Sequence, residues 1–310
     1  MPTPDEMSGA DFQALYSQLR STAPGADTPR GALDTVTHEQ VLAAIREVRS
    51  GYTVSLAAPV NTRTAPDDAE PAEHRLTAPA AGVQEERGLQ FARDRIAMNV
   101  HGDVNSHIDA LCHVIYDGTL HRGVPATEAL SPDAAIEQSI ELARDGIVGR
   151  GVLLDIARLH DVSWLEPGTH VSLEDLAAAE VRQGVHVDRG DILLVRVGHR
   201  RRRDELGPWD VADARAGLHP TAVRFLADRQ VAVLGSDGNN DAAPSVSRDV
   251  AFPVHVLAIH AAGVHLLDYL QLEDLARLCA GEGRWSFLCV IAPLRFPGAT
   301  GSPVNPLAIL

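Results

Sequence analysis

The stretch Asp103–His113, with the sequence DVNSHIDALCH, concentrates carboxylate, amide and imidazole side chains within eleven residues. Alternate side chains of an extended strand point to the same face. The four polar residues expected on one face are Asp103, Asn105, His107 and Asp109. His113 follows beyond Ala110–Cys112, where the chain can turn. This combination suits a hard or borderline divalent cation, so the stretch predicts a metal site. The alternative is a polar strand edge with a buried histidine that is satisfied by hydrogen bonds.

The same stretch resembles the signature of the metal-dependent cyclase superfamily, which includes bacterial kynurenine formamidases and isatin hydrolases. The family pattern is H-x-G-T-H-x-D-x-P-x-H. His107, Asp109 and His113 match its second His, its Asp and its last His. Asp103 stands in place of the first His, Asn105-Ser106 replace Gly-Thr, and Leu111 replaces the Pro. The resemblance implies a metal site with Asp103 as a variant, harder ligand.

A second cluster, FPVHVLAIHAAGVHLLDYL, spans Phe252–Leu270. The family places a metal-binding His and then a Glu in a pattern like H…G-(x)4-E. His255, Gly263 and Asp268 fall on this pattern, with Asp in place of Glu. His260 and His265 match no family ligand, and we interpret both as structural or supporting residues. The ligand set that the resemblance implies is Asp103, His107, Asp109, His255 and Asp268.

The resemblance also implies roles for residues around the metal. His113 is the expected general acid/base, because it matches the final histidine of the family and imidazole titrates near working pH. Asp109 is the natural bridge between two ions, since a carboxylate has two oxygens. Asn105 and Tyr116 are candidate hydrogen-bond donors to the substrate. Asp237, in the segment SDGNND, is expected to orient a ligand histidine, although the segment is also typical of a turn.

The amino-acid composition indicates which classes of binding partner the protein has. The 310 residues carry a formal net charge of −15, which argues against nucleic acid and favours a small-molecule substrate. The three cysteines, Cys112, Cys279 and Cys289, form no CxxC pair, which is typical of a reducing cytoplasm. Neither a signal peptide nor an apolar run of about 18 residues is present, so no membrane segment is expected. The family resemblance implies a homodimer or homotetramer.

Strands alternate with helices along the chain, which predicts an α/β fold with a central mixed sheet or barrel. The resemblance implies a swivelling β/β/α domain of the cyclase type. Residues 1–30 are expected to form an N-terminal arm and residues 31–310 one catalytic domain. Asn61–Glu86 is expected to be an irregular loop or lid. Expected strands include Tyr52–Leu56, Arg93–His101, Gly151–Ile156, Asp191–Val197, Val231–Leu234, Val264–Leu267 and Ser286–Ala292. Expected helices include Thr37–Ser50, Pro132–Asp145, Ser172–Gln183, Pro220–Asp228, His255–Ala262 and Leu272–Leu278.

Together these features predict a metal-dependent hydrolase that acts on an amide, lactam, lactone or ester bond of a small molecule. The expected cofactor is one or two ions of Zn or Mn. Carboxylate ligands favour Mn, whereas imidazole ligands are also compatible with Zn. One alternative is a metal-dependent cyclase or lyase in a small-molecule pathway. The other is a non-catalytic family member that has lost its metal, which the His→Asp and Glu→Asp changes motivate.

Overall fold

A nine-stranded sheet forms the centre of the molecule in the computed structural model, which describes residues 6–77 and 91–310. Its strand order is β1-β13-β11-β5-β7-β9-β10-β4-β12. The four central strands are parallel to one another: β5 (Ile147–Asp155), β7 (Ile192–Arg196), β9 (Val233–Ser236) and β10 (His265–Asp268). Parallel strands are covered on both faces, which explains the continuous apolar runs in these segments.

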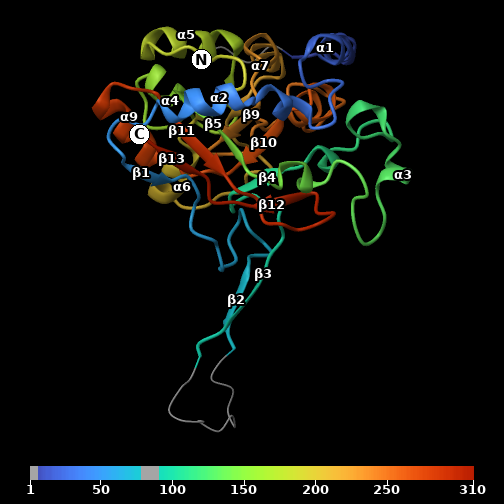
Figure 1. The fold of residues 1–310 in the computed structure, drawn as a ribbon, viewed down its shortest axis with the longest axis horizontal. Helices are drawn as coiled ribbons and strands as arrows, with labels where there is room; N and C mark the ends of the chain where they lie inside the picture. Colours follow the sequence, from blue (N-terminus) through green and yellow to red (C-terminus); the bar gives the residue numbers. More distant parts are fainter. Residues whose placement is uncertain (1–5, 78–90) are drawn as a thin grey trace.

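Antiparallel strands extend the sheet on both sides (Figure 1). On one side lie β11 (Ser286–Ile291), β13 (Leu307–Ile309) and β1 (Thr53–Ser55). On the other lie β4 (His107–Asp109) and β12 (Gly301–Pro303). The sheet curls into a half-barrel. The predicted α/β class with a central mixed sheet is therefore confirmed.

Helices cover the outer face of the sheet. The covering elements are α1 (Gly9–Thr22), α5 (Leu173–Gln183), α7 (Val223–Arg229) and the π-helix Val256–Ala261. They bury Phe12, Leu176 and Phe225 against the strands. α1 belongs to the expected N-terminal arm, and its buried residues lie in this core.

The inner face of the curled sheet holds a second core. The helix α9 (Glu273–Glu282) contributes Leu275 and Cys279 to it, and the strands contribute Leu153, Leu194 and Phe287. Successive residues of the same strand enter different cores, since Leu154 belongs to the outer cluster and Leu153 to the inner one. The two-residue period of the strands therefore divides the apolar side chains between two packed layers.

Side-chain caps set where two predicted helices begin. Thr37 and Gln40 form a capping box before α2 (His38–Ile45). Ser172 and Asp175 form another before α5. The remaining helices are short: α3 (Ala126–Ala129), α4 (Ile156–Leu159), α6 (His199–Leu206) and α8 (Pro253–His255). The strands β6 (His170–Val171) and β8 (Gly217–Leu218) form a separate parallel pair.

A two-stranded ribbon projects from the body (Figure 1). It consists of β2 (Glu73–Leu76) and β3 (Asp94–Ala97), and all eight residues are exposed. The expected irregular segment Asn61–Glu86 therefore contains a strand, and its residues 78–86 lie outside the described residues. The expected strand Arg93–His101 is β3, but it pairs with β2 and does not continue into the polar stretch.

The predicted helix Pro132–Asp145 is wrong. Only a 3₁₀ turn at Ile140–Ala143 forms there. The backbone of this segment bonds to distant parts of the chain: the Ala135 amide donates to Gly298 and the Ile140 amide to Ala299. These long-range hydrogen bonds replace the i→i−4 ladder of a helix, so tertiary pairing overrides local propensity.

No helix in residues 6–77 and 91–310 has both the length and the apolar character needed to cross a membrane.

Candidate metal centre

Three side chains meet where the strands β4 and β10 pair. In the antiparallel register Asp268 stands opposite His107, and Asp109 follows two residues later on the same face of β4. One ligand atom each from His107, Asp109 and Asp268 lies within 4.8 Å of the others, and all three residues are buried. The strand is shorter than expected, since β4 covers only His107–Asp109 and leaves Asp103 and Asn105 outside it.

Hydrogen bonding selects the nitrogen that His107 presents to its neighbours. Its Nδ1 donates to the carbonyl oxygen of Asn105 at 2.8 Å. The proton is therefore on Nδ1, and Nε2, at 3.6 Å from Asp109 Oδ1, is free to act as a ligand atom.

His255 enters the same cluster from a helix. Its Nε2 lies 3.3 Å from Asp268 Oδ2 and 3.5 Å from Asp109 Oδ2. Its Nδ1 is 2.6 Å from Asp241 Oδ2, and Asp241 also accepts from the amides of Val254 and His255. Burial lowers the pKa of His255, but the carboxylates of Asp109, Asp241 and Asp268 outweigh burial and raise it well above its usual value. The cluster therefore attracts a positive charge.

Two further histidines approach Asp109 from the other side. His101 Nδ1 is 2.9 Å from Asp109 Oδ1, and its Nε2 is 2.9 Å from Thr300 Oγ1. The His113 ring stacks on the His101 ring with centroids 3.7 Å apart. His101, Asp109 and His113 form a second group whose ligand atoms lie within 4.8 Å of one another. Burial lowers the pKa of His113 to about 4, so its imidazole is neutral near pH 7.

Asp109 belongs to both groups and carries an unsatisfied oxygen. Its Oδ2 is buried and has no hydrogen-bond partner among the described residues. Burial raises the pKa of this carboxyl, but the imidazoles of His101, His255, His113 and His107 outweigh burial and hold it well below its usual value. An ionised, buried carboxylate whose Oδ2 makes no hydrogen bond and has only the His255 ring nearby, at 3.5 Å, fits a metal ligand, since divalent cations prefer such oxygen donors.

The loop after β9 supports this arrangement. Asn239 and Asn240 donate side-chain hydrogen bonds to the carboxylate of Asp268, and the Asn240 amide donates to the same group at 3.1 Å. Asp241 holds His255 from the same loop. One loop therefore positions a carboxylate and an imidazole that come from separate elements.

The structure places some predicted site residues elsewhere. Asp103 is exposed, accepts a hydrogen bond from the Tyr269 hydroxyl at 2.7 Å, and belongs to neither candidate group. His101 stands near Asp109 instead. The pattern H-x-G-T-H, with its first position on Asp103, does not include His101, which lies two residues earlier in the chain. The preceding histidine in HGDVNSH is the signal that points to it.

Asp237 also differs from its expected role. Its Oδ1 accepts from the amide of Val197 at 2.7 Å, while Asp241 contacts His255. Both aspartates lie in SDGNND, so the prediction names the correct segment but the wrong residue.

The two expected substrate donors already have protein partners. Asn105 is buried and its Oδ1 accepts from the Asn61 amide at 2.8 Å. Tyr116 packs beside Tyr16 of α1, and its hydroxyl accepts from Gln13 at 2.6 Å.

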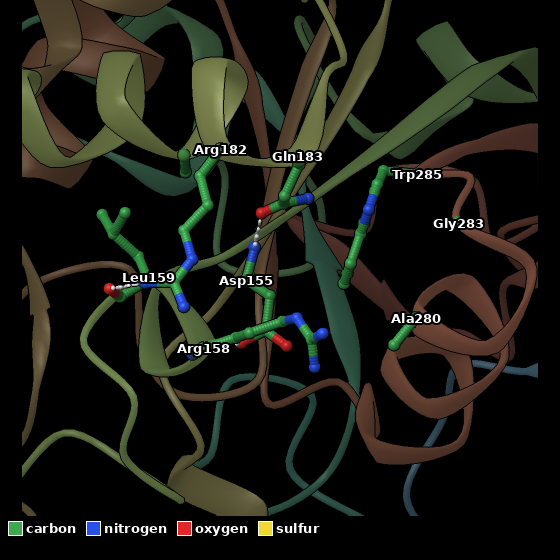
Figure 2. A pocket seen from close by; sticks show the side chains of 9 residues that line it. Asp155, Arg158, Leu159, Arg182, Gln183, Ala280, Gly283 and Trp285 are labelled. Carbon is green, nitrogen blue, oxygen red and sulfur yellow. Dashed lines mark hydrogen bonds between the residues drawn. The ribbon is translucent and has the colours of Figure 1, made fainter.

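A separate cavity of about 280 Å³ opens beside Asp155, at the carboxyl end of β5 (Figure 2). Its polar side chains bond to the surrounding backbone: Gln183 accepts from the Asp155 amide at 2.8 Å, and Arg182 donates to the Leu159 carbonyl at 2.7 Å (Figure 2). Arg158 lies over the ring of Trp285. None of the candidate metal ligands lines this cavity, so it is distinct from the metal centre.

Comparisons with known proteins agree with this fold. A solved structure described as a novel cyclase shares 29% identity, with a TM-score of 0.84, over 94% of this chain and 99% of that one. Isatin hydrolase A from Labrenzia aggregata is 21% identical, with a TM-score of 0.58, over 87% and 97%. A predicted metal-dependent hydrolase from Bacillus stearothermophilus is 21% identical, with a TM-score of 0.52, over 83% and 97%. No curated protein matches the chain.

The last two structures share the fold at low identity. The model of the Cyclase family, described as "Putative cyclase", matches residues 29–241. This range includes His107 and Asp109 of β4 and the loop that holds His255 and Asp268, whereas His255 and Asp268 themselves lie beyond it. The resemblance predicted from the sequence is confirmed: the chain belongs to the cyclase family.

Proposed function

We propose that the protein is a metal-dependent hydrolase that cleaves an amide, cyclic amide or ester bond of a small molecule. The observation that carries the proposal is the surroundings of Asp109. This buried, ionised carboxylate has an oxygen without a hydrogen bond and is surrounded by imidazoles and by Asp268. The names of structural relatives, which include isatin hydrolases, support the same class of reaction.

The donor atoms fit one or two divalent ions. His107, Asp109 and Asp268 would hold one ion with His255 at hand, and His101 and His113 would share Asp109 for a second. Mixed imidazole and carboxylate ligands suit Zn or Mn. When bound, the metal supplies an acidified water as nucleophile and polarises the scissile carbonyl group.

The side chains around the metal have separate roles in proton transfer and in orienting the ligands. When a single ion is held by His107, Asp109 and Asp268, His113 is not a ligand, and its neutral imidazole would accept a proton from the attacking water and return it to the leaving group. Asp241 holds the His255 ring in place through Nδ1. Asn239 and Asn240 keep the Asp268 carboxylate turned toward His107. Residues from the loop therefore orient groups that come from β10 and α8.

The test begins with the metal content of the purified protein, measured by mass spectrometry before any chelator is added. Zn or Mn at a stoichiometric level, together with turnover of a panel of amides, lactones and esters, supports the proposal. Products formed in heavy-oxygen water should carry the label. Turnover without label would identify a cyclase or lyase, and failure to bind either metal would contradict the hydrolase.

A further inference from the structure

A histidine outside the metal cluster lacks any hydrogen bond. His199, the first residue of α6, is 5% exposed, and its Nε2 is buried without a partner among the described residues. Its Nδ1 also makes no hydrogen bond in residues 6–77 and 91–310. Burial and four nearby arginines lower the pKa of His199 to about 3, so the ring is neutral. A buried N–H without an acceptor is destabilising, and a ligand oxygen would supply the missing acceptor.

The next residue is a cation without a close counter-ion. Arg200 is 6% exposed and makes neither a hydrogen bond nor an ion pair within 4.0 Å among the described residues. The other arginines of α6 differ from it in having acidic partners: Arg201 bonds to Glu205, Arg202 to Glu166 and Arg203 to Asp67. The carboxylate of Asp204, one turn further along α6, and those of Asp67 and Asp237 act on Arg200 only from beyond 4.0 Å. A single planar guanidinium matches the two oxygens of a carboxylate.

The beginning of α6 also has no side-chain cap. The residue before it, Gly198, has a φ of +84° and provides no side-chain cap. A Cβ at Gly198 would lie 2.6 Å from the Cα of Trp164, so no capping side chain fits there. The first amides of a helix have no intrahelical acceptor, and the helix dipole favours negative charge at this end. Both Gly198 and His199 are buried, which makes unsatisfied amides there costly.

This end of α6 lies beside the metal centre. The His199 ring packs against the Tyr269 ring at 5.4 Å between centroids, and the Tyr269 ring lies 6.4 Å from that of His107. On its other side His199 contacts Trp209 at 4.8 Å. A Cβ at Gly238 would lie 3.2 Å from His199, so the loop that carries Asp241 borders it directly.

We propose that His199 and Arg200, with the amino end of α6, bind a carboxylate group of the substrate. The inference rests on the proposed function, because it names the class of molecule that the hydrolase takes. One carboxylate oxygen accepts from the His199 ring and the other from the Arg200 guanidinium. The substrate is then a small organic acid whose scissile bond lies only a few atoms from its carboxylate, since the ring of Tyr269 separates His199 from His107.

The experiment compares benzoate with benzamide, its neutral isostere, by isothermal titration calorimetry. Three variants of the full chain are used: His199→Phe, which keeps the ring contacts, Arg200→Met, and Arg201→Gln as a matched control on the same helix. We expect the wild type to prefer benzoate, and His199→Phe and Arg200→Met each to weaken benzoate binding by about tenfold or more. Arg201→Gln should leave it unchanged. Arg200→Lys keeps the charge and should restore part of the affinity if Arg200→Met unfolds.

The titrations are repeated with metal-loaded and with chelator-treated protein. Benzoate binding that survives metal removal and still depends on Arg200 supports the carboxylate site even if the hydrolase proposal fails. Benzoate binding that requires metal and is unaffected by His199→Phe and Arg200→Met would place the anion on the metal and overturn the inference, while the hydrolase proposal would stand. Equal binding of benzoate and benzamide, or no binding of benzoate to folded protein, would also overturn it.

Discussion

Asp241 contacts His255 in two ways, through the Nδ1 of its ring at 2.6 Å and through its backbone amide at 2.9 Å. The same carboxylate therefore orients the ring and caps the helix that carries it. Asp241 lies after β9, whereas the His255 ring faces Asp109 of β4 and Asp268 of β10. A single residue thus ties the helix to the strands of the metal centre.

Replacing Asp241 with Asn should weaken metal binding by about 10–100-fold, which is typical of lost support behind a histidine ligand. Asn keeps the shape but removes the charge that raises the pKa of His255. The measurement is a Zn or Mn titration of chelator-treated protein. Asp213→Asn, on the exposed surface, serves as control. Equal affinity in the Asp241→Asn variant and the wild type would show that His255 is not held as a ligand.

Substitutions of His107 and of His113 should affect metal binding and turnover differently. His107→Ala should abolish metal binding, because it removes a ligand from the buried group with Asp109 and Asp268. His113→Ala should keep at least one ion and lower turnover by about 10²–10⁴-fold. Mass spectrometry of the metal content and an assay with the best panel substrate decide the outcome. Full activity in His113→Ala would refute its role as acid/base.

His101 and Asp103 give opposite expectations. His101→Ala should weaken metal binding by at least about tenfold, since its ring contacts Asp109. Asp103→Asn should change metal affinity by less than about twofold, because Asp103 is exposed and Asn keeps an acceptor for Tyr269. Both are compared by the same metal titration. A large loss of metal affinity in Asp103→Asn and little change in His101→Ala would show that Asp103, and not His101, is the ligand.

His265 should be replaceable by an apolar residue. It is fully buried, and neither ring nitrogen has a hydrogen bond among the described residues. Removing an unsatisfied polar group should raise the free energy of unfolding by about 1–3 kcal/mol in His265→Leu. The matched control is His121→Leu. His121 is equally buried but faces the carbonyls of Gly25 and His260, so this change should destabilise. Urea unfolding of both variants checks the prediction, and a less stable His265→Leu contradicts it.

Asp237 should make the protein less stable as pH rises. Burial raises the pKa of this carboxyl to about 6, above its ordinary value in the unfolded chain. Between these values the folded state binds more protons than the unfolded state, so stability falls as pH rises from about 4 to 6. Asp237→Asn should remove this part of the profile and stabilise the protein by about 2–3 kcal/mol at pH 7. Urea unfolding between pH 4 and 7 measures it. Parallel profiles for the variant and the wild type would contradict the raised pKa.

The sequence by itself determined the elements whose signals are local. Continuous apolar runs marked β5 and β7 as buried strands, and the capping residues Thr37 and Ser172 marked two helix starts. The period of two placed His107 and Asp109 on one face of a strand. Each of these features depends on residues close together in the chain, so the sequence alone predicts it.

Only the tertiary structure decided which distant residues meet. The register of β10 against β4 brings Asp268 opposite His107, and the loop after β9 selects Asp241 over Asp237 as the partner of His255. His101 reaches Asp109 although it lies outside any strand. Hydrogen bonds across the sheet and between loops set these positions. They depend on backbone pairing between segments far apart in the chain, which no local pattern of side chains records.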